Sequence, residues 1–376
     1  MVELLNVNMT DLETLNRKGV LRHINSQYNP GGYFDAVHII TRNENDFKLP
    51  LDGNIHLHRV PNYHNAVINL LNDTRHLARI VKENEVAVIR GRGPFQSGWQ
   101  AVVVGRRTKK PMVVSCGGDY QLVHDLTNQY EFKSRFLTDR VEEYVLTHAD
   151  RVFVYNEFTK RYCCTRGAPA EKIRVVPVRV DQSLFNPQTS GENIRRELGI
   201  GNAPLVLFVG IMYEYNQVDS VAAIVPRVLL KERNAYFLFV GGGPMANAIK
   251  HSLEYCGSHV HFWDYQPQER IAQIMAAATV VLIPMSVFVL LEAAAAAKPI
   301  VAYDIEWHSE FVENYVTGRL VGNRNELQAA EAIVELIRDE ALAKELGMNA
   351  RKKMERDYDE QKLIKHEIAM YQELLH

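Results

Sequence analysis

Short runs of β-branched and aromatic residues recur along the chain, and most are followed by a longer segment whose apolar residues have helical spacing. Apolar runs bounded by Gly, Pro, Asn or Asp predict buried strands, and their alternation with helices predicts parallel sheets with crossover connections. In the first half of the chain, the predicted strands are 4–7, 36–41, 55–60, 86–89, 111–115 and 151–155. In the second half, they are 205–209, 236–240, 259–262, 280–283 and 299–303. The pattern therefore predicts an α/β protein with two doubly wound domains.

A segment rich in proline and small polar residues separates the two runs of strands, at 175–200. From residue 326 onward, apolar residues return every three or four positions, which predicts helices that pack through one apolar stripe. We therefore expect a first domain at 1–180, a second domain at 181–355 and a final helix at 356–376.

One stretch of the second domain carries the clearest chemical signal. The apolar run 280–283 ends at Pro284, and Ser286 then stands where a helix cap belongs. Glu292 follows in the early turns of the predicted helix. A carboxylate at a strand-to-helix junction is suited to a pair of ribose hydroxyl groups, because it can accept two hydrogen bonds. The competing interpretation of 280–297 is a membrane span, against which Pro284, Ser286 and Glu292 argue.

Composition narrows the class of protein. A length of 376 residues with 47% hydrophobic content suits about two domain cores, and a net charge of -2 argues against a nucleic-acid partner. The 4 cysteines lack metal-ligand spacing, which favours a reducing compartment and no structural metal. The first residues lack the apolar core of a signal peptide, so we expect a cytoplasmic protein.

Several segments, in their order and spacing, resemble the family-4 glycosyltransferases. They are VFVYNEFTKRYC, VVPVRVDQSLFNP, LFVGIMYEYNQVDSV, FLFVGGGP, LLEAAAAAKPIVAYD and VTGRLV. The resemblance covers most of the chain and is closest at about 150–350. It implies a GT-B fold, in which two Rossmann-like domains face each other across a cleft. The second domain would hold the nucleotide sugar, the first domain the acceptor, and the last helix would cross back to the first domain.

The resemblance also implies a set of site residues. The nucleotide sugar would contact Gly19, Gly210, Gly243, Tyr265, Ser286 and Glu292. Gly19 and Gly243 have an alternative interpretation as ordinary turn glycines. Asp119 and Glu292 are the predicted catalytic residues. Asp119 would orient a hydroxyl group of the sugar or of the acceptor, and Glu292 would contact the donor ribose, although Asp119 is equally well placed to cap a helix.

A loop after the last predicted strand contains Trp307, His308 and Glu310. It lies at the end of the sheet where such folds bind ligands, and a plain solvated loop is the alternative.

The chain also departs from the family pattern. Ile211 and Asn216 stand where relatives carry an arginine and a lysine that clamp the diphosphate, the loop before Ser286 is about four residues short, and only the second of two glutamates is present. Arginines near strand ends or in the linker that could substitute for these cations are Arg22, Arg90, Arg92 and Arg179, although a solvated surface arginine is the favoured interpretation of each.

Three functions follow from these observations. The first is a retaining transferase that moves a sugar from a nucleotide diphosphate to a hydroxyl of a glycan, lipid-linked or small-molecule acceptor, without a bound metal. The second is a catalytically degenerate partner or regulator of an active glycosyltransferase, and the third is another nucleotide-linked chemistry. Basic residues at 106–110, and mixed basic and aromatic residues at 132–140, suit peripheral contact with the inner face of a membrane, although a solvated helix face is the favoured interpretation.

Overall fold

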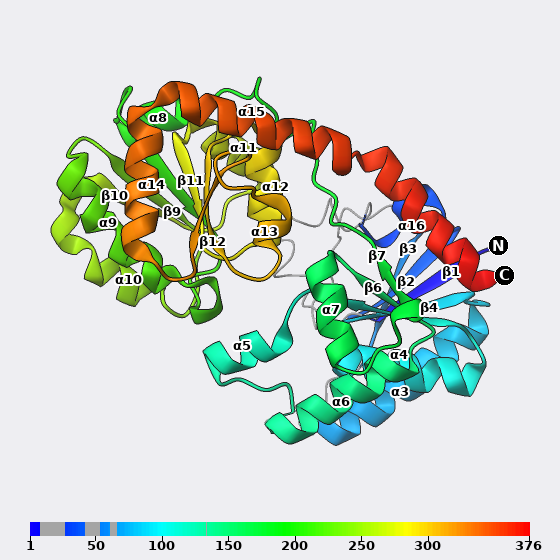
Figure 1. The fold of residues 1–376 in the computed structure, drawn as a ribbon. Coiled ribbons are helices and arrows are strands. Elements are labelled where there is room, and N and C mark those ends of the chain that lie inside the picture. Colours follow the sequence, from blue (N-terminus) through cyan, green and yellow to red (C-terminus); the bar gives the residue numbers. More distant parts are fainter. Residues whose placement is uncertain (8–26, 42–52, 61–65, 133) are drawn as a thin grey trace. The chain divides into compact units, whose positions relative to one another are not determined.

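The structure is a computed structural model that describes residues 1–7, 27–41, 53–60, 66–132 and 134–376. The chain forms two compact units (Figure 1). Unit 1 consists of residues 1–177 and 361–376, and unit 2 consists of residues 178–360.

Unit 1 is built on a sheet of seven parallel strands in the order β3-β2-β1-β4-β5-β6-β7. The strands are β1 (Glu3–Val7), β2 (Ala36–Thr41), β3 (Ile55–Arg59), β4 (Val88–Arg92), β5 (Met112–Cys116), β6 (Arg151–Val154) and β7 (Ile173–Val175). The order reverses between β1 and β4, which makes their carboxyl ends the topological switch point of this sheet.

Helices cover the two faces of this sheet. They are α3 (Ala66–Glu83), α4 (Gln96–Thr108), α5 (Tyr120–Thr127), α6 (Arg135–His148), α7 (Glu157–Thr165) and α16 (Glu360–Leu375). Successive strand residues point to opposite faces, so Leu5 packs in the cluster that includes residues of α3 and α4, while Leu4 packs in the cluster that includes Tyr371 of α16.

A buried ion pair fixes α16 on the sheet of unit 1. The Arg90 guanidinium donates to Glu367 Oε1 and to the Tyr371 hydroxyl, both at 2.7 Å, and to Ser115 Oγ at 2.9 Å. Arg90 is only 4% exposed. The prediction that Arg90 is a spare cation for a ligand is therefore wrong, because its charge is compensated inside unit 1.

Unit 2 has a six-stranded parallel sheet in the order β10-β9-β8-β11-β12-β13. The strands are β8 (Leu205–Val209), β9 (Tyr236–Val240), β10 (Val260–Trp263), β11 (Val280–Ile283), β12 (Ile300–Asp304) and β13 (Arg319–Gly322). The helices are α8 (Glu192–Leu198), α9 (Val218–Lys231), α10 (Ala246–Ser252), α11 (Gln268–Ala277), α12 (Val287–Ala295), α13 (His308–Phe311), α14 (Glu326–Arg338) and α15 (Glu340–Asp357). Its switch point lies between β8 and β11.

The two sheets confirm the predicted α/β class and the two doubly wound, Rossmann-like sheets. The sequence pattern misses β7 and β13, which are 3 and 4 residues long. It also places the fourth strand too early, since β4 runs from Val88 to Arg92 and includes two polar positions at its carboxyl end.

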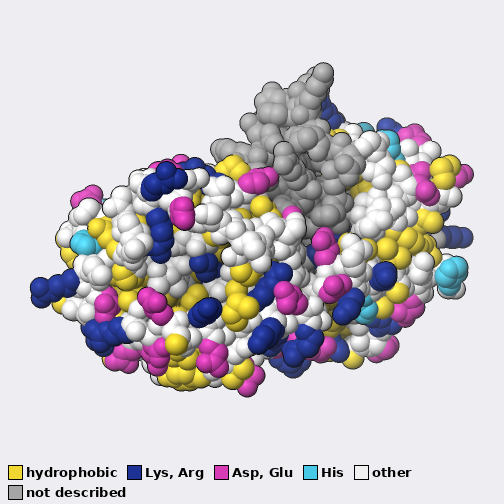
Figure 2. Space-filling view, turned by 90° about the horizontal axis from the view of Figure 1, so that it is seen from above, with side chains coloured by type: hydrophobic (Ala, Val, Ile, Leu, Met, Phe, Trp, Pro, Cys, Tyr) yellow, Lys and Arg dark blue, Asp and Glu magenta, His cyan; other side chains and the backbone are white. Residues whose placement is uncertain are grey.

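The apolar stretch 280–297 divides into β11 and α12, and α12 is only 9 residues long. Of the helices that the structure describes, none combines the length and the apolar character needed to cross a bilayer. Figure 2 shows acidic and basic side chains interspersed over the visible face, as expected for a chain whose charges nearly balance.

Candidate functional site

The loops that follow β8 and β9 pack backbone against backbone at the carboxyl edge of the unit 2 sheet. The Met212 amide donates to the Gly242 carbonyl at 2.9 Å, and the Met245 amide donates to the Met212 carbonyl at 3.0 Å. Gly243 has a φ of +149°, and a Cβ there would lie 2.5 Å from the Met212 carbonyl oxygen. Glycine at 243 is therefore required by the packing of these loops, whether or not it contacts a ligand.

Gly210 begins the loop after β8, at the switch point. Its amide donates to the Val240 carbonyl at 3.0 Å, which extends the pairing of β8 with β9 by one residue. Ile211 follows and is 41% exposed. The Asn216 side chain donates to the Ile211 carbonyl at 2.7 Å, so it stabilises its own loop. The two positions where relatives have cations thus hold an exposed apolar side chain and an amide that bonds within its own loop.

Ser286 caps α12, as its position in the sequence predicts. Its hydroxyl accepts from the Val289 amide at 3.2 Å. The Ser286 amide donates to His308 Nε2 at 3.4 Å, and His308 Nδ1 donates to the Tyr303 carbonyl at 2.9 Å. These two partners fix one neutral tautomer of His308, and burial lowers the pKa of His308 to about 4.

His308 and Trp307 are buried, with exposed fractions of 0% and 2%. The interpretation of 307–310 as a solvated or ligand-facing loop is therefore wrong for these two side chains. The imidazole instead ties the end of β12 to the first residues of α12. Sequence reasoning missed this role, and the only available signal was a histidine shortly after a buried strand.

A second hydrogen-bonded chain joins other helix starts at the same edge. The Tyr303 and Ser220 hydroxyl groups lie 2.5 Å apart, and the Ser220 hydroxyl donates to Glu326 Oε1 at 2.9 Å. The Tyr215 hydroxyl donates to Glu306 Oε1 at 3.0 Å. The beginnings of α9 and α14 and the loop after β12 are thereby held together.

Glu292 lies on α12 and is 5% exposed. Burial raises the pKa of its carboxyl group to about 7, opposed by a hydrogen bond from Gln268 Nε2 to Glu292 Oε1 at 3.4 Å. An acid with so little hydrogen bonding in a buried position is typical of a functional site. Gln268 begins α11, shortly after the loop that contains Tyr265, so Glu292 lies close to that loop.

Tyr265 bridges the loops after β9 and β10. Its hydroxyl donates to the Gly242 carbonyl at 3.2 Å, and a Cβ at Gly242 would lie 3.2 Å from the Tyr265 ring. The predicted unit 2 residues thus come from four neighbouring strand ends. They are Gly210, Gly243, Tyr265, Ser286 and Glu292.

The other two predicted site residues belong to unit 1. Asp119 caps α5, where its Oδ1 accepts from the Leu122 amide at 3.0 Å, so the capping interpretation is confirmed. Asp119 follows β5 and lies at the carboxyl edge of the unit 1 sheet. Gly19 lies outside the described residues.

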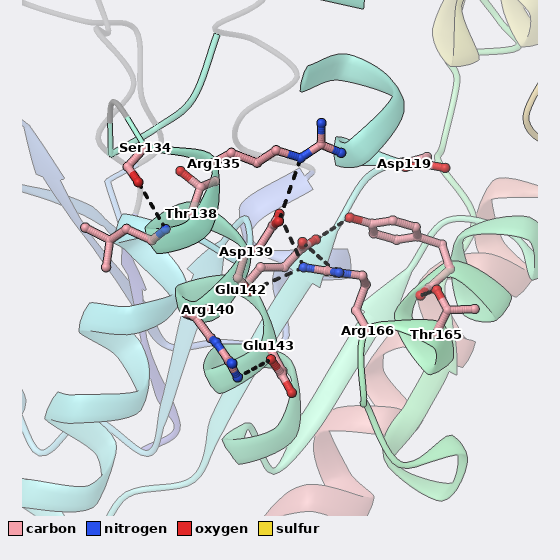
Figure 3. Close-up of polar contacts among 12 residues, drawn as sticks. Asp119, Ser134, Arg135, Thr138, Asp139, Arg140, Glu142, Glu143, Thr165 and Arg166 are labelled. Atoms are coloured by element: carbon pink, nitrogen blue, oxygen red, sulfur yellow. Dashed lines mark hydrogen bonds and ion pairs between the residues drawn. The ribbon is translucent and has the colours of Figure 1, made fainter. Parts of the chain in front are cut away.

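A network around the buried acid Glu142 joins α6 to α7 (Figure 3). Glu142 of α6 is fully buried and accepts from the Tyr162 hydroxyl at 2.5 Å and from Arg166 Nε at 3.0 Å. Arg166 also pairs with Asp139 at 3.4 Å. Burial raises the pKa of Glu142, while Tyr162 and Arg166 oppose that change. All partners of this acid are internal, so it fixes α7 against α6.

Two family models match the chain. Residues 203–339 match the model described as "Glycosyl transferases group 1", and residues 23–179 match the model described as "Glycosyl transferase 4-like domain". The matched ranges contain most of the strands of the two sheets.

Named relatives agree with these models. The chain is 26% identical over 216 residues to a GDP-mannose-dependent alpha-(1-6)-phosphatidylinositol monomannoside mannosyltransferase of Mycobacterium tuberculosis, covering 54% of the chain and 56% of the relative. It is 28% identical over 302 residues to a D-inositol 3-phosphate glycosyltransferase of Acidothermus cellulolyticus, covering 70% and 65%. The chain therefore spans 56% of the length of the first relative and 65% of the length of the second.

Solved structures share the fold over their whole length. HepE of Anabaena in complex with UDP superposes with a TM-score of 0.80 at 16% identity, covering 99% of this chain and 100% of that chain. Sucrose-phosphate synthase of Thermosynechococcus elongatus superposes with a TM-score of 0.82 at 18% identity, covering 100% and 99%.

Proposed function

We propose that this chain, a member of the group 1 glycosyltransferases, is a retaining transferase. It would transfer a sugar from a nucleotide-diphosphate donor to an acceptor hydroxyl group with retention of configuration. The observation that carries the proposal is the buried, weakly hydrogen-bonded carboxyl group of Glu292 at the carboxyl edge of the unit 2 sheet.

Unit 2 would bind the nucleotide part of the donor. A carboxylate that accepts two hydrogen bonds suits the 2′ and 3′ hydroxyl groups of ribose. Among the described side chains, the Glu292 carboxyl group has one long hydrogen bond, from Gln268. The loop of Tyr265 lies near Gln268 along the chain and would read the base. In the relatives, HepE was solved with UDP-glucose, and the mannosyltransferase is named for GDP-mannose.

The diphosphate would be bound mainly by backbone amides. Gly210 gives close access to the backbone after β8, and α12 presents the first-turn amides that Ser286 does not cap. Without an arginine at 211 and a lysine at 216, about two charge-assisted hydrogen bonds are missing, each worth roughly 1.5 to 3 kcal/mol. The donor should therefore bind more weakly than in a clamp-bearing relative.

Unit 1 would bind the acceptor, with Asp119 at the carboxyl edge of its sheet. The chemistry would be substrate-assisted and metal-free, with the departing phosphate taking the acceptor proton on the same face of the sugar. In that scheme Glu292 and Asp119 bind and orient substrates, and neither is a nucleophile.

The exposed side chains of α6 favour peripheral contact with the anionic, cytoplasmic face of a membrane. Phe136 is 71% exposed and Leu137 is 47% exposed, and Arg140 lies over the Phe136 ring at 5.4 Å. Two exposed apolar side chains beside exposed arginines suit a headgroup layer. Flotation with anionic vesicles at low salt tests this, and a Phe136→Ser, Leu137→Ser variant that floats equally well would contradict it.

A second candidate is a catalytically degenerate partner of an active glycosyltransferase. The exposed Ile211, with Asn216 bonded to its carbonyl, favours this alternative, because neither side chain can neutralise a diphosphate. The buried, weakly hydrogen-bonded carboxyl group of Glu292 argues for retained nucleotide binding in either case.

Calorimetric titration tests whether the protein binds a nucleotide donor, as the transferase proposal requires. UDP, GDP and ADP, then UDP-glucose and GDP-mannose, should be titrated with and without magnesium. We expect saturable binding of one nucleotide, and a weaker Kd in Glu292→Ala than in the exposed control variant Glu345→Ala. Release of nucleotide from the matching donor would establish turnover. If folded protein binds none of these nucleotides or nucleotide sugars, the transferase proposal is contradicted.

A further inference from the structure

Arg92 ends β4 at the switch point of the unit 1 sheet, and no acidic side chain pairs with it among the described residues. Its Nε donates to Asn6 Oδ1 at 3.4 Å, its Nη2 donates to the Gln27 carbonyl at 3.2 Å, and its guanidinium lies over the Tyr28 ring at 4.1 Å. All these partners are neutral. Its neighbour Arg90, by contrast, has the Glu367 carboxylate.

Within the described part of the chain, the charge of Arg92 is therefore uncompensated in a partly buried place. Burial and the nearby Arg90 both lower the pKa of Arg92, which expresses the same electrostatic conflict. An arginine guanidinium presents five donors in a planar fork that matches carboxylate and phosphate oxygens. Nη1 has no hydrogen bond to any described residue, so part of that fork is unused.

Asn6 supplies a second unused donor beside Arg92. It lies on β1, paired across the switch point with β4, and its exposed fraction is 0%. Because Asn6 Oδ1 accepts from Arg92, its Nδ2 is oriented as a donor, and Nδ2 has no partner among the residues that the structure describes. A buried polar atom without a partner costs roughly 1 to 3 kcal/mol, so it calls for an explanation.

The start of α4 adds a third source of positive potential. This helix has 13 residues, and its N-cap, Phe95, makes no side-chain cap. Close packing brings it to the strand end, since a Cβ at Gly98 would lie 2.5 Å from the Gly93 carbonyl oxygen. The Ser97 hydroxyl donates to the Arg92 carbonyl at 2.5 Å. The uncapped amides of the first turn therefore begin within a few residues of Arg92.

We propose that the carboxyl edge of the unit 1 sheet binds an anionic group of the acceptor, a phosphate or a carboxylate, through Arg92, Asn6 Nδ2 and the first turn of α4. The assignment of this anion to the acceptor rests on the proposed function, in which the donor residues Tyr265, Ser286 and Glu292 belong to unit 2. Acceptors with a negatively charged group next to the reacting hydroxyl would then be preferred over neutral sugars.

Titration of the full chain with inorganic phosphate, followed by glucose 6-phosphate and glucose, tests the site. We expect phosphate and glucose 6-phosphate to bind and glucose to bind at least tenfold more weakly. Arg92→Gln should weaken phosphate binding roughly ten- to a hundredfold, and Arg92→Lys should weaken it less, because the charge remains. The control Arg107→Gln changes an exposed arginine near the far end of α4 and should leave the Kd unchanged. Equal phosphate affinities in the wild type and a folded Arg92→Gln variant would overturn the proposal.

A second measurement serves if Arg92→Gln does not fold. In protein labelled with nitrogen-15 in arginine, the Nε resonance that is missing from the Arg92→Lys spectrum identifies Arg92. Added phosphate should shift this resonance in the wild-type spectrum. An unshifted resonance would overturn the site.

A separate experiment tests whether the bound anion belongs to the acceptor or to the donor diphosphate. The nucleoside diphosphate found by calorimetry should bind with the same affinity in Arg92→Gln, and saturating phosphate should not displace it. Competition between the two would assign the site to the donor diphosphate and overturn the acceptor assignment. Arg92-dependent phosphate binding without any nucleotide binding would contradict the proposed function and leave the anion site standing.

Discussion

Glu292→Gln should stabilise the protein at alkaline pH while it weakens nucleotide binding. The carboxyl group of Glu292 has a usual pKa of 4.5 and a pKa of about 7 in the fold, because burial disfavours its ionised form. Between these pH values, the folded state holds a proton that the unfolded state has lost. Stability therefore falls as pH rises from 4.5 to 7, and it stays lowered above 7.

The size of this effect follows from the same numbers. A difference between 4.5 and about 7 corresponds to about 3 kcal/mol of lost stability above pH 7. Glutamine has a similar shape and no charge, and it can still pair with Gln268. We therefore expect Glu292→Gln to unfold at higher urea concentration than the wild type at pH 8, with a gain of up to about 3 kcal/mol that vanishes near pH 4.5.

Nucleotide affinity should respond in the opposite direction. The ionised carboxylate is the better acceptor for ribose hydroxyl groups, so wild-type affinity should rise through pH 7, and the Glu292→Gln affinity should be nearly independent of pH. Urea unfolding and calorimetry at pH 5, 7 and 8 measure both effects, with Glu345→Gln, an exposed acid of the same unit, as the control. A variant that gains nothing at pH 8 relative to pH 5 would refute the buried-charge explanation.

Three further changes test other parts of the structure. Glu367→Gln should lower the free energy of unfolding by about 3 to 5 kcal/mol in urea titration, because it leaves Arg90 buried without a counter-charge; a loss below about 1 kcal/mol would show that water compensates Arg90. Gly243→Ala should destabilise unit 2 in thermal unfolding by more than about 1 kcal/mol, since its φ and the nearby Met212 carbonyl both exclude a Cβ; an unchanged Tm would refute the packing explanation. The double change Ile211→Arg, Asn216→Lys should tighten binding of a nucleoside diphosphate by roughly 3 to 6 kcal/mol in calorimetry if the phosphate pocket is otherwise intact; no gain would show that the loop has been rebuilt.

The buried strands were predictable because their apolar runs are long enough to be distinctive. Strands such as β8 and β9 consist entirely of apolar residues and have the predicted bounds. β13 contains Arg319 and Gly322 in only four positions, so its sequence resembles a loop. It becomes a strand because β12 offers a parallel edge beside it.

Polar residues were less predictable than strands, since their partners are distant along the chain. The position of Ser286 predicts a cap, which needs only the amide of Val289. His308 contacts backbone groups of Ser286 and Tyr303, and Arg90 contacts Glu367, 277 residues away. No local pattern identifies such pairs, so the sequence of β4 does not reveal that Arg90 is buried and paired.

The division of unit 1 between two chain segments has a consequence for biosynthesis. Unit 2 is continuous, and all of its residues are synthesised before residues 361–376. Unit 1 has to wait for those residues, and until Glu367 and Tyr371 emerge, the Arg90 charge lacks its partners. The unit whose strands are synthesised first therefore completes its packing last, and a chain that lacks residues 361–376 would leave the apolar face that Tyr371 covers exposed.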